Sequence, residues 1–297
     1  MTATPRHDAV MPAEVLSLLM PGRGGLFVDC TVGLGGHSAL LLDAGADRLL
    51  GLDRDTDALR LAAERLSMFG DRVELVHSDY RQLGQVLETR SVVGVNGVLA
   101  DLGVSSMQLD ADGRGFTFRR DEPLDMRMDR SQGPTLADLL VDVHEEDLAN
   151  VIFQFGEERH SRRIARAIVR RRESGRIAST GELSALVRRA VPTRGYQRID
   201  PATRTFQALR IWVNKELEGL DTFLTNTSRR LIAGARLAVI SFHSLEDRIV
   251  KHTFRAIAAA GEAWQVLTRK PVLAGDEEVA RNPRARSAKL RAIERLA

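Results

Sequence analysis

The chain has 297 residues, of which 43% are hydrophobic and 28% are charged, and its formal net charge is +3. This composition excludes a disordered or fibrous chain, and no apolar run approaches the roughly 20 residues that a membrane-spanning helix needs. A single cysteine, Cys30, excludes an internal disulfide framework and, with no apolar signal segment at the N-terminus, predicts a cytoplasmic protein.

Strand and helix signals alternate through the first third of the chain. Short apolar runs predict strands at residues 26–29, 48–53, 73–77 and 97–101. Amphipathic patterns between them predict helices at about 36–45, 55–68 and 80–88. This alternation is typical of a parallel sheet covered by helices on both faces, so the sequence predicts an α/β fold with a doubly wound sheet.

The alternation stops after the fourth strand. Residues 106–213 show helical patterns and charged loops, and a buried strand returns only at residues 236–241. A later alternating segment, residues 287–293, predicts an antiparallel strand that finishes the sheet. We therefore expect a discontinuous domain of residues 1–105 and 214–297, with a helical domain, 106–213, inserted where parallel strands form their ligand crevice.

A glycine-rich turn follows the first predicted strand. Gly33, Gly35 and Gly36 carry little bulk, which lets backbone N–H groups approach a ligand at the start of a helix. The second predicted strand ends in Asp53, which is well placed to accept hydrogen bonds from a ribose. Ser38 stands where a dinucleotide fingerprint has its third glycine. The spacing thus leaves open a dinucleotide, a nucleoside such as S-adenosylmethionine, or a structural turn without a ligand.

Two further side chains follow predicted strands. Asp101 ends the fourth strand and is expected to face the crevice, where it either contacts a ligand or caps a turn. Gln108 follows in the next loop, as a ligand contact or a plain loop residue. His243 follows the predicted strand at residues 236–241. It is a candidate general base, a candidate substrate contact or a helix cap. The seven histidines show no i,i+4 pair and there are no paired cysteines, so no metal site is predicted.

Arginines and aromatic residues mark two segments of the predicted insertion. Arg114, flanked by Phe116 and Phe118, could pair with phosphate and stack on a base, or belong to a small aromatic cluster under a loop. Residues 157–176 predict an amphipathic helix with a basic side, which includes Arg163, Arg166 and Arg170. Such a side can be merely solvated, but arginines favour bidentate phosphate contacts. With a second basic cluster at residues 281–291, they predict a nucleic-acid partner.

Long blocks of this sequence resemble those of a known enzyme family. They are DCTVGLGGHS, GLDRD, DLGVSSMQLD, RGFTF, PLDMRMD, GEERHSRRIARAIV, PATRTFQALRIWVN, SFHSLEDRIVK and NPRARSAKLR. From His7 to about Arg291 the chain is similar to the bacterial 16S rRNA cytosine-N4 methyltransferases, often called MraW. The resemblance implies a class I, Rossmann-like methyltransferase core, the cofactor S-adenosylmethionine, a helical insertion that recognises 16S rRNA, and methylation of a decoding-region cytidine in the small subunit.

The resemblance also implies roles for individual residues. The implied cofactor contacts are Gly35, Gly36, His37, Asp53 at the ribose, Tyr80 beside the adenine, Asp101 and Gln108. Tyr80 stands where the family is expected to have Phe. Asp200 stands before Pro201 where the family often has His, which leaves the role of that position open.

The chemistry implied for this family sets a requirement on the site. The exocyclic amine of cytosine is a poor nucleophile, so it has to be held in line with the methyl group and near a proton acceptor. We expect Asp101 to be that acceptor, with His243 second, and Phe116 and Phe118 to support a base turned out of its stack. A non-catalytic RNA-binding or ribosome-assembly protein and an NAD-dependent oxidoreductase are the alternatives. The sequence leaves homo-oligomerisation open.

Overall fold

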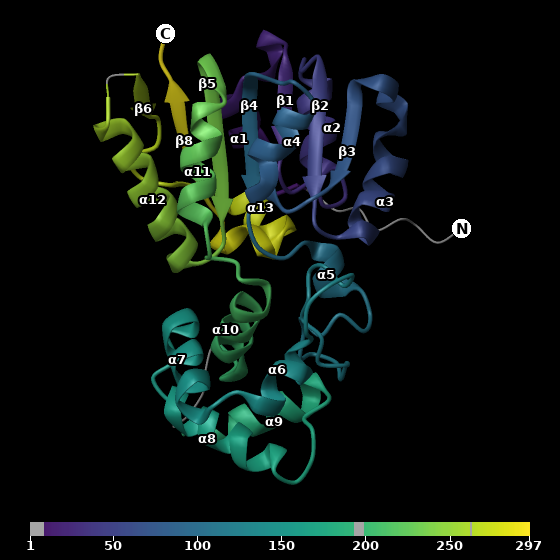
Figure 1. Ribbon diagram of the computed structural model, residues 1–297, viewed down its shortest axis with the longest axis vertical. Helices are drawn as coiled ribbons and strands as arrows, with labels where there is room; N and C mark the ends of the chain where they lie inside the picture. Colours follow the sequence, from purple (N-terminus) through teal and green to yellow (C-terminus); the bar gives the residue numbers. More distant parts are fainter. Residues whose placement is uncertain (1–8, 193–198, 262) are drawn as a thin grey trace. The chain divides into compact units, whose positions relative to one another are not determined.

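The computed structural model describes residues 9–192, 199–261 and 263–297 (Figure 1). His7, where the family-like blocks begin, lies outside the described residues. The chain divides into two compact units, the first comprising residues up to Gly103 and from Gly219 onward, the second Val104–Glu218. The division thus falls at 103/104 and 218/219, where the sequence led us to expect 105/106 and 213/214.

The first unit is built on one mixed sheet. Its strands are β1 (Leu26–Asp29), β2 (Arg48–Asp53), β3 (Val73–His77), β4 (Val95–Asp101), β5 (Leu231–Ser241), β6 (Trp264–Val266), β7 (Val272–Leu273) and β8 (Lys289–Arg295). Their order is β3-β2-β1-β4-β5-β8-β6, with β7 also paired to β8, and the first five strands are parallel. The strand order reverses between β1 and β4, and ligands of such sheets bind outside the carboxyl ends at this reversal.

The predicted α/β fold is confirmed, with one correction at the edge of the sheet. Strands β1, β2 and β3 have the predicted bounds, and β8 pairs antiparallel with β5 as expected. However, β8 does not finish the sheet, because β6 and β7 pair with its other side. These two strands have three and two residues, too few for an alternating pattern to be recognised in the sequence.

Helices cover both faces of this sheet. They are α1 (Pro12–Leu19), α2 (Gly36–Asp43), α3 (Thr56–Leu66), α4 (Leu83–Thr89), α11 (Leu220–Arg229), α12 (Ser244–Ala259) and α13 (Asp276–Arg281). Val28 and Val98 point to the face that α4, α11 and α12 cover, whereas their neighbours Phe27 and Leu99 point to the face of α1, α2 and α3. In Figure 1, α4 and α11 lie in front of the strands. Because successive residues of a strand alternate between faces, a nearly continuous apolar strand buries both.

The second unit is helical. Its helices are α5 (Ser106–Asp110), α6 (Leu136–Asp142), α7 (Glu145–Gly156), α8 (Ser161–Arg172), α9 (Thr180–Ala190) and α10 (Ala202–Asn214). Leu148, Ile164 and Leu209 are fully buried where α7, α8 and α10 pack together. The long loop before α6 is held by Asn214, whose side-chain N–H donates to Met126 O over 2.8 Å. Among the described residues of this unit, the β-type pairing consists of one isolated bridge.

Asp200 has a structural role just before α10. Its carboxylate accepts a hydrogen bond from Ala202 N–H at 2.9 Å and pairs with Arg188, whose Nη2 is 2.9 Å away. Burial alone would raise the pKa of Asp200, but the hydrogen bonds from Arg188 and Ala202 and the charge of Arg188 together outweigh it, so the pKa is lowered. The residue that departs from the family pattern therefore binds the first N–H of α10 as an ionised carboxylate. No helix within the described ranges is long and apolar enough to cross a membrane.

Candidate functional site

The glycine turn connects β1 to α2 and lies against the end of β2. Gly33 and Gly35 have φ values of +52° and +75°, a left-handed conformation that L-residues with a side chain rarely adopt. A Cβ atom on Gly35 would lie 3.1 Å from Cγ of Leu66, so the turn also has little room. Gly33 N–H donates to Asp53 Oδ2 over 2.8 Å. The turn and the carboxylate that the sequence singled out are thus joined directly.

Asp53 is a partly buried carboxylate held by backbone donors. Besides Gly33, the N–H of Asp55 donates to its Oδ1 over 2.9 Å. Burial nevertheless raises the pKa of Asp53 to about 6, against the lowering effect of these two bonds. Each carboxylate oxygen can accept a second hydrogen bond, so Asp53 retains the capacity to bind a pair of hydroxyl groups.

Asp29, at the end of β1, is a site residue that the sequence reasoning missed. It is fully buried and accepts hydrogen bonds from Ser38 Oγ at 2.7 Å and from Thr31 N–H at 3.2 Å. Burial raises its pKa to about 6. Ser38, which interrupts the dinucleotide fingerprint, therefore has a structural purpose, since it holds this carboxylate. The signal available in the sequence was an aspartate at the end of a predicted apolar strand.

Asp101 ends β4, the strand next to β1. Its N–H donates to Thr31 Oγ1 over 2.7 Å, and its Oδ2 lies 3.8 Å from Nε2 of His37 in α2. Its Oδ1 is buried and has no hydrogen-bond partner among the described residues. Burial, followed by the charges of Asp29 and Glu246, raises the pKa of Asp101 well above its usual value. The carboxyl group is therefore suited to a ligand that brings a positive charge or a hydrogen-bond donor.

Tyr80 lies in a short 3-10 turn, η3 (Tyr80–Gln82), after β3. Its ring packs on Phe223 of α11, with centroids 4.7 Å apart and planes tilted by 60°. Burial raises the pKa of Tyr80, so its hydroxyl stays neutral. Asp79 caps the turn by accepting a hydrogen bond from Arg81 N–H at 2.9 Å. Sequence reasoning missed Asp79 and Phe223, which fix the position of this ring.

His243 is the N-cap of α12. Its Nδ1 accepts a hydrogen bond from Glu246 N–H at 3.4 Å, and its Nε2 lies 3.1 Å from Glu246 Oε1. Glu246 in turn accepts a hydrogen bond from Phe242 N–H at 2.9 Å. Both ring nitrogens thus face the first turn of their own helix. Of the three roles that the sequence left open, this geometry matches the helix cap.

Gln108 belongs to the second unit and serves a local purpose there. Its Oε1 accepts a hydrogen bond from Ser105 N–H at 3.0 Å, and its own N–H donates to Ser105 Oγ over 3.2 Å. This reciprocal pair is a capping box that begins α5. The carbonyl oxygen of the side chain is therefore used by the helix cap.

The structure corrects the interpretation of Arg114. Only 3% of the residue is exposed, and its Nη2 donates to the carbonyl oxygens of Arg127 and Met128 over 3.2 and 3.0 Å. A guanidinium that is buried and bonded to backbone carbonyls is not available to a phosphate. Arg114 therefore anchors the long loop of the second unit.

The two phenylalanines beside it are also structural. Phe116 is buried in the core of the second unit. Phe118 is half-buried and packs edge-on against Phe206 of α10, with ring centroids 4.7 Å apart. A base could not stack on the buried ring of Phe116, so the expectation for this residue is wrong and the alternative of an aromatic cluster under a loop describes it. Phe118 keeps part of its surface exposed, and its role beside a base stays a prediction.

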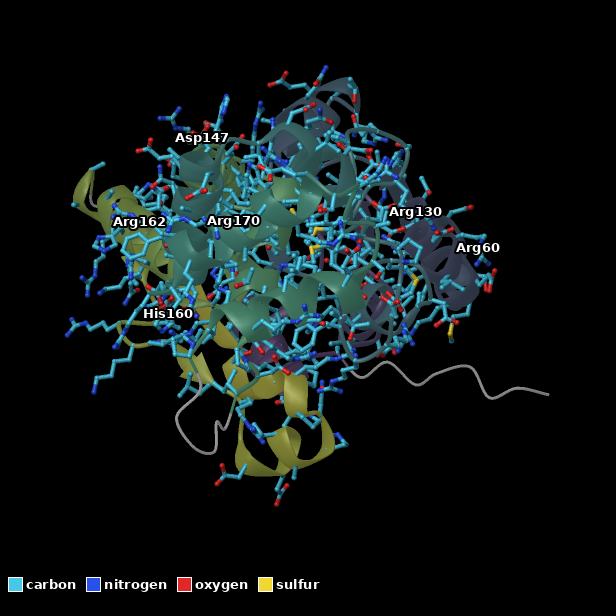
Figure 2. All side chains as sticks on the ribbon, turned by 90° about the horizontal axis from the view of Figure 1, so that it is seen from below. Arg60, Arg130, Asp147, His160, Arg162 and Arg170 are labelled. Carbon is cyan, nitrogen blue, oxygen red and sulfur yellow. The ribbon has the colours of Figure 1, made fainter. Side chains whose placement is uncertain are left out.

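Helix α8 presents an exposed row of arginines, as the sequence predicted. We define the arginine face as Arg159, Arg162, Arg163, Arg166 and Arg170, which are all exposed. Figure 2 labels Arg162 and Arg170 of this row. Arg166 Nε lies 3.3 Å from Glu145, while the other four have no carboxylate partner within the described part of the chain. Ile164 and Ile168 are fully buried on the opposite side of the helix.

Not every arginine of this segment belongs to that face. Arg171 pairs with Glu182 of α9. Arg172 donates from Nη1 to the carbonyl oxygens of Leu140 and Val143 over 3.0 and 2.6 Å. These two side chains join α8 to its neighbours, so the arginines available to a partner are those of the arginine face.

Comparison with known proteins agrees with the resemblance seen in the sequence. A sequence profile of the MraW methylase family matches residues 4–296. A protein of Sorangium cellulosum (strain So ce56) named ribosomal RNA small subunit methyltransferase H is 50% identical, over 98% of this chain and 91% of its own. A protein of the same name from Geobacter sp. (strain M21) is 48% identical, over 98% of each chain. The family resemblance and the predicted cofactor, S-adenosylmethionine, are confirmed.

Proposed function

The chain belongs to the MraW methylase family, and on that premise we propose that it methylates N4 of one cytidine in the decoding region of 16S rRNA. The observation that carries the proposal is a set of three carboxylates, the buried Asp29 and the partly buried Asp53 and Asp101, at the carboxyl ends of three neighbouring parallel strands. The names of the relatives support an rRNA of the small subunit as substrate. The N4 atom and the decoding region come from the family resemblance. Such a substrate implies a cytoplasmic enzyme.

The donor groups of S-adenosylmethionine fit these carboxylates. The cofactor carries a ribose diol, an ammonium group and a positively charged sulfonium. Asp53 can accept two hydrogen bonds beyond those it already has, which suits the diol. Asp101 Oδ1 lacks a partner among the described residues, so it suits a donor group either of the cofactor or of the substrate amine. Carboxylates that burial has made weak acids are stabilised in their charged form when a cation binds beside them.

The remaining cofactor contacts are proposed for the turn and the adenine side. Gly35 and Gly36 would let the backbone approach the nucleoside, and His37 would contact it from the first turn of α2. Tyr80 offers an aromatic face that Phe223 holds in place, which suits an adenine. Gln108 stays a proposed contact on the family resemblance alone, and its carbonyl oxygen is bound in the capping box.

Bound S-adenosylmethionine supplies an electrophilic methyl carbon. The N4 amine would exchange one of its protons for this methyl group, so the chain has to hold the amine in place and offer a proton acceptor. Asp101 is the proposed acceptor, because its Oδ1 has no partner among the described residues. His243 is the weaker candidate, since its Nδ1 already accepts a backbone N–H. Holding the amine in line with the methyl group provides the rest of the rate enhancement, up to roughly 7–11 kcal/mol.

The arginine face is the proposed rRNA contact of the helical unit. Arg163 and Arg170 are exposed cations without a carboxylate partner in the described ranges, and Arg166 has one exposed partner at 3.3 Å. Guanidinium groups bind phosphates in a bidentate manner. Each phosphate that this face neutralises would release counterions from the RNA. The contribution of the arginine face to RNA affinity would therefore fall as the salt concentration is raised.

The test is the transfer of labelled methyl groups to small ribosomal subunits from a strain that lacks this gene. The modified nucleoside is identified by mass spectrometry and its position mapped by digestion. We expect N4-methylcytidine at a single position. Subunits from a strain that carries the gene are the control and should accept little label. Cofactor binding without transfer would contradict the substrate, and a methyl group on another base or atom would contradict the proposed specificity.

A further inference from the structure

The first unit has a pocket that is separate from the strand ends described above. It lies between α12 and the sheet edge formed by β6 and β8, and its volume is about 270 Å³. Its lining consists of Lys251, Phe254, Arg255, Val266, Thr268, Arg269 and Arg291. In Figure 1, α12, β6 and β8 stand together at one edge of the sheet. Lys251 and Arg255 follow His243 by about 12 and 18 Å along the helix axis, since an α-helix rises 1.5 Å per residue.

Cations dominate the lining, and three of them are not neutralised. Lys251 is half-buried, and Arg255 and Arg269 are exposed. None of the three has a carboxylate partner within the part of the chain that the structure describes, and no lining residue is acidic. Like charges brought together around one cavity repel each other unless an anion lies between them. The pocket therefore has the electrostatics of an anion site.

The fourth cation, Arg291, is held in place by a carboxylate. Its Nε lies 2.6 Å from Asp247 Oδ1 and its Nη2 lies 3.3 Å from Asp247 Oδ2. Lys289 Nζ lies 3.7 Å from the same carboxylate. Two residues of the basic cluster that the sequence indicated near the C-terminus thus share one carboxylate. The cations left for a ligand come instead from α12 and from the segment after β6.

The floor of the pocket combines an apolar surface with a hydroxyl donor. Phe254 is 1% exposed and Val266 is half-buried beside it. Thr268 is 5% exposed, and its Oγ1 accepts a hydrogen bond from Ala292 N–H at 2.9 Å. The hydroxyl hydrogen of Thr268 remains available to donate, because that bond uses only its oxygen. A phosphate joined to a sugar matches a cationic rim, one hydroxyl donor and an apolar floor better than a bare inorganic anion does.

We propose that this pocket binds a backbone phosphate of the substrate RNA, with Arg255 and Arg269 on the phosphate and the half-buried Val266 beneath the attached sugar. The proposal rests on the proposed function, which makes RNA the substrate. A polymer suits the site because the two arginines are exposed at its rim, where a chain can enter and leave. The pocket thus gives the catalytic unit an RNA contact of its own, independent of the arginine face.

The test compares two double variants that remove the same charge. Arg255→Ala/Arg269→Ala alters the pocket, and Arg48→Ala/Arg229→Ala alters two exposed arginines elsewhere in the first unit that have no carboxylate partner within the described residues. Affinity for small subunits and for a 16S rRNA fragment is measured over a salt series. We expect the pocket variant to bind RNA about tenfold more weakly than the control. The slope of its log affinity against log salt concentration should be smaller in magnitude by about one. Cofactor affinity and Tm should match those of the control.

The outcomes separate this proposal from the proposed function. One outcome is that the wild-type protein methylates subunits while the two variants bind RNA with equal affinity. That result would overturn the proposed RNA contact of the pocket and leave the proposed function intact. Another outcome is that the pocket variant loses the binding of cytidine monophosphate and keeps its RNA affinity. That result would make the pocket a site for free nucleotides and overturn the proposed RNA contact. A wild-type protein that neither binds nor methylates the RNA would overturn both proposals.

Discussion

Two regions of the molecule hold charge that the protein does not neutralise, in different surroundings. At the ends of β1, β2 and β4, the carboxylates Asp29, Asp53 and Asp101 form no ion pair with lysine or arginine in the described parts of the chain, and burial raises their pKa values. On α8, Arg162 and Arg170 also lack carboxylate partners there but are exposed. The first region holds weak acids that a ligand can ionise, while the second holds permanent charges that water already solvates.

The difference indicates two kinds of recognition. A buried carboxylate responds only to a ligand that reaches it and carries a donor or a cation, so its contribution is specific and depends on pH. An exposed arginine attracts any polyanion over about a Debye length, so its contribution depends on salt. Substitutions in the first region should change chemistry and cofactor binding, and substitutions in the second should change the affinity for RNA.

The largest effect is expected for Asp101→Asn. If Asp101 accepts the amine proton, the rate of methyl transfer at saturating cofactor should fall about 100-fold or more. Stability should change little, because asparagine has the shape of the protonated acid that burial favours. Single-turnover transfer to small subunits measures the rate.

His243→Asn is the matched comparison for Asp101→Asn. Asparagine is a good helix N-cap, so this variant should keep α12 and most of the transfer rate. A normal rate in Asp101→Asn with weakened cofactor binding would show that Asp101 binds the cofactor instead. A large loss in His243→Asn with normal stability would make His243 the acceptor.

Asp53→Asn is expected to weaken the binding of S-adenosylmethionine by about 10- to 100-fold, the size of a lost hydrogen bond to a charged group. Calorimetry of the purified protein measures this affinity. RNA affinity should stay unchanged, since the arginine face is untouched. Unchanged cofactor affinity would remove Asp53 from the ribose site.

The variant Arg162→Ala/Arg163→Ala/Arg170→Ala should bind RNA about tenfold more weakly. The slope of its log affinity against log salt concentration should be smaller in magnitude by about two to three. Cofactor affinity and Tm should remain those of the wild type. Filter binding or fluorescence anisotropy over a salt series provides the data. The control removes three exposed arginines from the first unit, at positions 48, 60 and 229. Equal losses in the two triple variants would show that net charge, and not this face, determines affinity.

Ser38→Ala should have the smallest effect, on stability. It deletes the 2.7 Å hydrogen bond to the buried Asp29 and should cost about 1–3 kcal/mol in the free energy of unfolding. Ser67→Ala removes a bond of similar length, 2.8 Å from its Oγ to Glu64 O, at an exposed position and should stay within about 0.5 kcal/mol of the wild type. Urea unfolding measures both. Equal losses would contradict a special role for the buried bond.

Much of the core was predictable because local patterns determine it. The strands at residues 26–29, 48–53 and 73–77 are short apolar runs between turns and helices, and the structure reproduces their bounds. Asp53 and Asp101 were recognised because they end such strands. Asp29 also ends such a strand, so the same signal was available, but its contact with Ser38 could not be read from the sequence.

Other features depend on contacts that no local pattern reveals. The sequence cannot show that the guanidinium of Arg114 meets the carbonyl oxygens of Arg127 and Met128, which are distant along the chain. For the same reason Arg291 looked available, although Asp247 neutralises it. Charge patterns indicate where arginines gather, and only the fold separates those that hold the protein together from those that face a partner.

The most direct test of the account is the affinity for S-adenosylmethionine between about pH 5 and 7. The pKa values of Asp29 and Asp53 are raised from 3.8 to about 6 in the folded protein, so the empty site takes up protons as the pH falls through 6. A ligand that binds the ionised carboxylates should bind most tightly above pH 6 and lose up to about tenfold per pH unit below it. The Asp53→Asn variant should bind S-adenosylmethionine more weakly, and its affinity should depend less on pH. A wild-type affinity that stays constant across this range would contradict the role of the buried carboxylates.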